Sequence, residues 1–292
     1  MADSSRCRYT PTSFCFQGTN AIYGLVLVDY IFTLLEYENY QTDKIDGLTG
    51  SLNGIMNYLL YLQMPNKHFA DHFQYRQSTK SNTFSGYFDG ESILCLVKAA
   101  KYIPGNQHLI PIIEATTPVL LQHYSVDTWR AEQVHDSPTT KGFYQWSSMV
   151  AQEYFTARWK RFEVMGDYCL AMAHWIIVTH RILLRKANTG YAYEGILSAY
   201  QVAQALGRTE IVESLAMVIE KGLYKLSTWQ VGGPLSRHNR FLQNHGSSEL
   251  IALGGIMNYA DRAPLRIDTT QHQMHAVMMA LEQIYTEDLE TE

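Results

Sequence analysis

The chain has 292 residues, of which 46% are hydrophobic and 17% charged, and its formal net charge is −5. This composition is typical of a globular protein with a sizeable core and excludes a disordered chain. Lysine and arginine are scattered, so we expect no nucleic-acid partner. The 20 tyrosines combine an apolar ring with a polar group. Such side chains occur at the edges of cores and also line clefts for polar ligands such as sugars.

The N-terminal residues 1–20 are rich in serine, threonine and proline and predict an irregular arm. No charged segment followed by an apolar one marks a signal peptide, which favours a cytoplasmic location. The most apolar stretch, residues 21–35, is too short to cross a bilayer and contains Asp29, so we expect no membrane span. The cysteines have no metal-site spacing, and Cys95 and Cys169 fall on apolar helix faces, which predicts buried thiols in a reducing compartment.

Helical periodicity dominates the rest of the chain and predicts an all-α fold. Turn residues such as Pro65-Asn66, Pro104-Gly105 and Gly232-Gly233-Pro234 separate the helices. No low-complexity linker interrupts residues 21–292, so we expect them to form a single domain. The expected helices lie at about 20–38, 47–63, 89–103, 108–124, 143–162, 166–186, 190–206, 209–228, 246–258 and 267–285, and two long loops at 127–141 and 230–246.

Three segments begin with glycine and an aromatic residue and then continue as amphipathic helices. They start at Gly86, Gly142 and Gly190. A weak repeat of this length, about one helical hairpin, indicates stacked or ring-closed helix pairs. We therefore expect an (α/α) toroid or an incomplete toroid, with the three glycine ends on the same side.

The C-terminal helix carries an unusual polar face. Asp268, Gln271, His272 and His275 follow one another at helical spacing and share one side of the helix. One interpretation is a cavity wall in which Asp268 orients His272. The alternatives are a solvated face or a structural hydrogen-bond knot.

A second polar cluster lies in the loop that ends at Gly246. Asn244 and His245 could hold a carboxylate and move a proton, while Arg237, His238 and Arg240 could bind an anion. The alternative is an exposed polar loop.

Two further arrangements have chemical meaning. His68 and His72 have the i, i+4 spacing of a metal-binding pair, but no third ligand can be named. Carboxylates at the helix starts, among them Asp89, Glu91 and Glu194, could form the pair that a glycosidase requires. They could equally be ordinary acids of a first helical turn.

Together, the glycine-aromatic helix starts, the Gly254-Gly255 and Arg266–His272 segments and the Gln243-Asn244-His245 loop resemble the (α/α)-toroid carbohydrate-active proteins. This group includes uronyl epimerases, polysaccharide lyases and six-hairpin glycosidases. The resemblance implies that Asn244 holds a uronate carboxylate while His245 and a tyrosine transfer protons. Adding the polar clusters and the helix starts described above, we expect the catalytic residues to be His245, Tyr191, Tyr144, His272 and Asp268, and the substrate-binding residues to be Asn244, Arg237, Trp146, Glu194 and Arg266.

We therefore expect an enzyme that acts on an oligo- or polysaccharide, with an acidic one favoured, by proton transfer as a lyase or epimerase. We expect no cofactor and no bound metal. The alternatives are a non-catalytic helical-repeat binding module and a glycosidase with paired carboxylates. The sequence leaves open whether the chain belongs to a larger assembly or is a fragment of a longer polypeptide.

Overall fold

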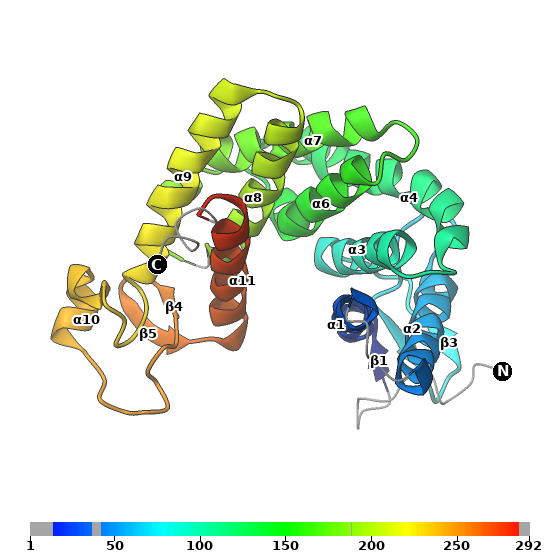
Figure 1. The fold of residues 1–292 in the computed structure, drawn as a ribbon, viewed down its shortest axis with the longest axis horizontal. Coiled ribbons are helices and arrows are strands. Elements are labelled where there is room, and N and C mark those ends of the chain that lie inside the picture. The colour runs from blue at the N-terminus through cyan, green and yellow to red at the C-terminus, as the bar shows by residue number, and fades with distance from the viewer. Residues whose placement is uncertain (1–13, 37–41, 188, 286–292) are drawn as a thin grey trace. The chain divides into compact units, whose positions relative to one another are not determined.

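The computed structural model describes residues 14–36, 42–187 and 189–285, and it is all-α, as predicted (Figure 1). The chain divides into two compact units, Met1–Lys160 and Arg161–Glu292. The single domain and its toroid arrangement stay predictions.

The first unit contains four long helices and several short elements. In chain order they are β1 (Phe14–Phe16), α1 (Gln17–Glu36), α2 (Thr42–Leu62), β2 (His72–Gln74), β3 (Thr79–Lys80), α3 (Gly86–Tyr102), the 3₁₀ turn η2 (Gln107–Leu109), α4 (Ile110–Gln122), the π-helical turn η3 (His123–Asp127), α5 (Thr128–Glu132) and α6 (Pro138–Thr156). Most of the expected loop 127–141 is therefore helical. The side chain of Ser137 accepts hydrogen bonds from the second and third residues of α6, and Pro138 occupies its first position, so α6 begins earlier than expected.

Glycines let the helices of this unit approach closely. A Cβ atom on Gly18 of α1 would lie 2.5 Å from the ring of Phe88 in α3, and one on Gly24 would lie 2.5 Å from Cys95 Sγ. Both contacts advance in the same direction, so α1 and α3 run parallel. In the same way, a Cβ atom on Gly90 would lie 2.3 Å from Trp146 Cβ in α6. Gly86 packs on Phe143. The glycine-aromatic pair at the start of α3 therefore lies beside the pair in the second turn of α6, as the repeat predicts for these two segments.

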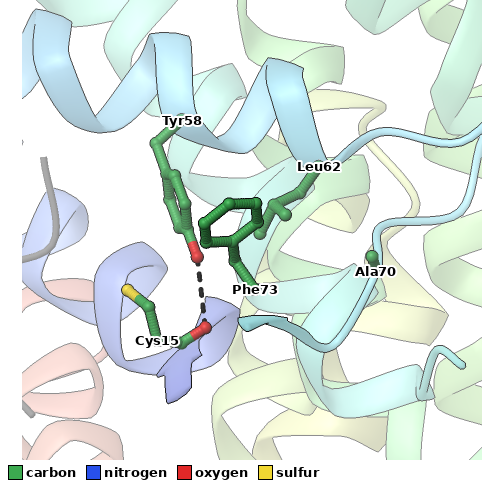
Figure 2. Close-up of a cluster of buried hydrophobic side chains, with 5 residues drawn as sticks. All are labelled: Cys15, Tyr58, Leu62, Ala70 and Phe73. Carbon is green, nitrogen blue, oxygen red and sulfur yellow. Dashed lines mark hydrogen bonds between the residues drawn. The ribbon is translucent and has the colours of Figure 1, made fainter. Parts of the chain in front are cut away.

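The start of the chain is more ordered than we expected. β1 pairs antiparallel with β2, which pairs with β3, and α1 begins at Gln17, so the prediction of an irregular arm is wrong for residues 14–20. Figure 2 shows the reason: Cys15 lies in a buried cluster with side chains of α2, the β2 strand and the loop before it, namely Tyr58, Leu62, Phe73 and Ala70. The hydroxyl of Tyr58 donates a 3.1 Å hydrogen bond to the Cys15 carbonyl.

The cysteines differ from one another. Cys95 and Cys169 are buried free thiols, as expected. Cys15 is disulfide-bonded, so the thiol prediction is wrong there. Disulfides are more typical of oxidising compartments, and the cytoplasmic location stays a prediction.

Helix α1 is apolar on most of its sides. It is long and apolar enough to cross a membrane by length and composition alone, a test that core helices of soluble proteins also pass. Ala21, Val28 and Ile31 are buried, and Asp29 forms an ion pair with Lys98 of α3. The absence of a membrane span stays a prediction.

The second unit is also built from hairpins. It contains α7 (Phe162–His174), the π-helical turn η4 (Trp175–Thr179), the 3₁₀ turn η5 (Ile182–Leu184), α8 (Gly190–Ala205), α9 (Thr209–Ser227), the 3₁₀ turn η6 (Ser236–His238), α10 (Arg240–Asn244), β4 (Met257–Tyr259), β5 (Arg262–Leu265) and α11 (Ile267–Gln283). α8 starts at Gly190, as expected. A Cβ atom there would lie 3.3 Å from the Gln273 backbone nitrogen of α11, so this glycine lets the two helices pack closely.

The expected helix at 246–258 is wrong. Gly254 adopts a left-handed backbone with φ +82°, which stops a right-handed helix and which glycine tolerates without strain. The chain then forms β4, which pairs antiparallel with β5. On α11 the buried side is Thr269, Gln273, Ala276 and Ala280. Met278 and Leu281 lie off this side and are exposed.

The α8–α9 contact gives a first test. A Cβ atom on Gly222 of α9 would lie 1.8 Å from the ring of Tyr193, which is fully buried. We expect Gly222→Ala to lower the free energy of unfolding by about 1–3 kcal/mol through overpacking. The control is Gly54→Ala in α2, where a Cβ atom meets nothing within 4 Å and the better helix former adds about 0.5–1 kcal/mol. Equal effects of the two substitutions in urea denaturation would contradict this packing.

Glu91 of α3 is a partly buried acid whose Oε2 atom is shielded from solvent. A Cβ atom on Gly18 would lie 2.5 Å from its Oε2 atom, and Oε2 has no hydrogen-bond partner among the described residues. Burial without a partner disfavours the charged form. It raises the pKa of Glu91 from 4.5 to about 8.

This shift predicts a pH-dependent stability. The folded state holds the proton more tightly than the unfolded state, so the folded protein loses stability as the pH rises from 4.5 through 8, at no more than about 1.4 kcal/mol per pH unit. Glu91→Gln should therefore stabilise the protein at pH 8 and change little at pH 4.5, as measured by thermal unfolding. The exposed Glu163 provides the control, Glu163→Gln. A difference between Glu91→Gln and the native chain that is independent of pH would disprove the shift.

Candidate functional site

The strongest candidate site joins α8 to α11. Glu194 lies one turn after Gly190, and close packing at that glycine brings its carboxylate against α11. His272 and His275 are three residues apart on α11, so they share the face that meets Glu194. Glu194 itself is only 1% exposed, whereas the side chain of His275 is 46% exposed.

Both imidazoles contact the same carboxylate through Nδ1. His275 Nδ1 lies 2.8 Å from Glu194 Oε1, and His272 Nδ1 lies 3.1 Å from Oε2 and 3.3 Å from Oε1. A buried carboxylate is stable only when hydrogen-bond donors surround it. The two Nδ1–H groups act as these donors, and the hydrogen bonds place a proton on Nδ1 of each ring.

This geometry suits proton transfer. An imidazole that carries its proton on Nδ1 has a lone pair on Nε2, and a neighbouring carboxylate stabilises the imidazolium that forms when Nε2 takes a proton. Because His275 is half exposed while Glu194 is buried, solvent reaches the histidine and not the carboxylate. His275 is therefore the most accessible side chain of the three.

Asp268 does not orient His272 as we expected. Its carboxylate accepts hydrogen bonds from Arg266 Nε at 2.9 Å and from the Thr269 backbone N–H at 2.9 Å. Burial alone would raise the pKa of Asp268, but these hydrogen bonds and the charges of Arg266 and His272 outweigh it and hold the pKa below its usual value. Glu194 takes the orienting position, and the Asp268–Arg266 pair lies at the N-terminus of α11.

Asn244 and His245 lie elsewhere in the second unit. They line an open hollow of about 450 Å³ together with Trp229, His238, Arg240 and Asp261, and neither Glu194 nor His272 belongs to its lining. The His245 ring stacks on Phe241 at 4.5 Å between ring centres, and its Nδ1 lies 3.1 Å from the Phe241 carbonyl. The N–H of Nδ1 donates to that carbonyl, so Nε2 of His245 is the lone-pair nitrogen.

The arginine that lines this hollow is not the one we expected. Arg240, not Arg237, is part of the lining. Arg237 is exposed in η6, beside His238, and the His238 Nδ1 atom lies 2.7 Å from the hydroxyl of Tyr224.

The expected aromatic residues are deeply placed. Tyr144 and Trp146 belong to α6 of the first unit, and Tyr191 belongs to α8 of the second; all three side chains are buried. Trp146 packs against Gly90, which gives it a clear role in helix packing.

His68 and His72 do not converge on one metal position. His68 Nδ1 lies 2.6 Å from Asp89, and His72 Nδ1 lies 2.6 Å from Asp71. Across residues 14–36, 42–187 and 189–285, no group of three histidine, cysteine or acidic side chains could hold a metal ion.

Comparison with protein-family models, with curated proteins and with solved structures finds no match for this chain. The candidate site therefore stands on its own geometry.

The Glu194 hydrogen bonds can be tested directly. Glu194→Gln keeps the shape of the side chain but removes the charge that both imidazoles contact. We expect a loss of about 1–3 kcal/mol in the free energy of unfolding and the loss of the downfield Nδ1–H signals of His272 and His275 in proton NMR. The control is Glu220→Gln, at an exposed position of α9. Retention of both downfield signals in Glu194→Gln would show that Glu194 is not their acceptor.

Proposed function

We propose that the chain is a carbohydrate-active enzyme that transfers protons at the Glu194–His272–His275 site. The observation that carries this proposal is a buried carboxylate that holds two imidazoles, one of which is half exposed. A positioned acid or base of this type accelerates proton transfer by about 10²–10⁴-fold. The sugar substrate is the class implied by the resemblance to (α/α)-toroid proteins.

The hollow at α10 supports a sugar with a carboxylate. Arg240 supplies a positive charge and Asn244 an amide donor, while Asp261 lies on the lining as well. Arginine and amide donors together suit a uronate carboxylate. The hollow would therefore anchor an acidic sugar unit of the substrate of a lyase or an epimerase, apart from the unit on which His275 acts.

One observation favours the glycosidase alternative. Glu91 has a pKa of about 8, which keeps it protonated at neutral pH, as a general acid requires. Its neighbour Asp89 is already surrounded by three donors. Glu91→Gln therefore separates the two functions, because it abolishes glycoside hydrolysis and leaves a His275-dependent reaction intact.

The decisive assay uses a panel of acidic and neutral oligosaccharides with product analysis by mass. We expect His275→Gln to lower kcat by about 10²–10⁴-fold while the melting temperature changes little, because the side chain is half exposed. Asn244→Ala should raise KM for acidic substrates only.

The matched control is His174→Gln, at an exposed position of α7, which should behave as the native chain does. Native turnover by His275→Gln would refute the proposal. A loss of thermal stability in Glu194→Gln with turnover per folded molecule unchanged would assign the cluster to folding alone.

A further inference from the structure

The first unit contains a second imidazole–carboxylate cluster, built around Asp89 of α3. Asp89 is fully buried, and its Oδ1 atom accepts a 2.7 Å hydrogen bond from the Phe69 backbone N–H. Its Oδ2 atom lies 2.6 Å from His68 Nδ1 and 2.6 Å from the hydroxyl of Tyr124. Three hydrogen-bond donors therefore surround this one buried carboxyl group.

This arrangement fixes the tautomer of His68. The carboxylate has no proton to give, so Nδ1 of His68 carries the proton and donates it. In the neutral ring Nε2 is then the lone-pair nitrogen, and within the described part of the chain no hydrogen bond to it is formed. His68 is only 4% exposed, so little of the ring meets bulk water, and the hydrogen-bonding capacity of Nε2 is open to a ligand or a water molecule.

Aromatic rings surround the imidazole. Phe84 stacks on it with ring centres 3.8 Å apart and is itself 36% exposed, and His123 packs against its edge at 4.5 Å. Burial is the main cause that lowers the pKa of His123, although Asp89 and Asp127 oppose this shift. Phe84 is therefore the exposed side chain that covers His68.

Two unusual backbone segments position the cluster. Lys67, immediately before His68, has a left-handed conformation with φ +73°, which costs energy for a residue other than glycine. His123 and Tyr124 belong to the π-helical turn η3. Turns of this type occur frequently at functional sites, and strain of this type persists where the surrounding structure imposes it.

We propose that His68 binds and polarises the hydroxyl group of a ligand, with Asp89 and Tyr124 as positioning residues and Phe84 as a cover over the imidazole. The ligand's O–H group donates a hydrogen bond to Nε2, and Nδ1–H donates to Asp89, so the ring holds the hydroxyl in place without a net transfer of its proton. The Asp89 carboxylate disfavours a second anion beside the ring. The cluster therefore selects a neutral alcohol, such as a sugar hydroxyl, over an anion.

This proposal does not depend on the Glu194 site, and its first test needs no turnover. Diethyl pyrocarbonate acylates unprotonated imidazole nitrogens, and peptide mass mapping gives the rate at each histidine. We expect slow modification of His68 in the native chain and a several-fold faster rate in Phe84→Ala. Phe241→Ala is the matched control, because Phe241 stacks on His245 in the same manner and should accelerate modification of His245 only. An unchanged rate of modification at His68 in Phe84→Ala would show that Phe84 does not shield the imidazole.

The second test identifies the ligand by nitrogen NMR of the imidazoles. Addition of a neutral oligosaccharide should shift the Nε2 signal of His68, while inorganic phosphate should not. Asp89→Asn should remove the downfield Nδ1–H signal and weaken the response by several-fold, and His108→Gln, at an exposed position, should keep both. A response to phosphate alone, or no response at His68 to the oligosaccharide in the native chain, overturns the proposal. The substitution His275→Gln should leave these signals unchanged. The proposal for His68 and the proposal for the Glu194 site can therefore be disproved separately.

Discussion

A carboxylate that leaves water must find hydrogen-bond donors, and this constraint shapes both units of the protein. Glu194 and Asp89 are almost completely buried, so each needs hydrogen-bond partners from the protein in place of water. Each recruits imidazole Nδ1–H groups, and Asp89 adds a tyrosine hydroxyl and a backbone N–H. The same hydrogen bonds that stabilise the acids also fix the histidine tautomers. Folding therefore satisfies the buried carboxylates and places the Nδ1 protons of the histidines in one step.

Close packing of the helices brings these groups together. Gly190 admits the backbone of α11 to the start of α8, and Gly86 admits Phe143 to the start of α3. A Cβ atom would meet its nearest neighbour at 3.3 Å at Gly190 and at 3.2 Å at Gly86, so the neighbouring atoms would have to shift by a few tenths of an ångström. Such a shift at Gly190 would lengthen the hydrogen bonds of Glu194 to the imidazoles and weaken them. The repeated glycines therefore matter for the sites as well as for the fold.

The sequence predicted the helices well because periodicity and turn residues are local signals. It located the starts of α3 and α8 through Gly86 and Gly190, and it placed His272 and His275 on one face of α11. It could not identify Glu194 as their partner, because that contact depends on the register between α8 and α11, residues nearly 80 positions apart. The sequence favours Asp268 as the partner of His272 because the two residues are close in the chain. Arg266 is closer to Asp268 and forms the hydrogen bond with it instead. The false helix at 246–258 has a similar origin, because apolar spacing alone does not reveal the left-handed Gly254.

The histidines of the two clusters differ in their exposure to solvent, and this difference affects their chemistry. His275 meets solvent directly, so a large molecule can approach it. His68 lies beneath Phe84, and a ligand must displace or share that ring to reach it. A covered base is protected from bulk water, and its electrostatic interaction with Asp89 is stronger in the less polar interior. An open site suits a polymer that slides past, whereas a covered site suits one hydroxyl group that is held in place. The depth of each histidine therefore determines the size of ligand that it can serve.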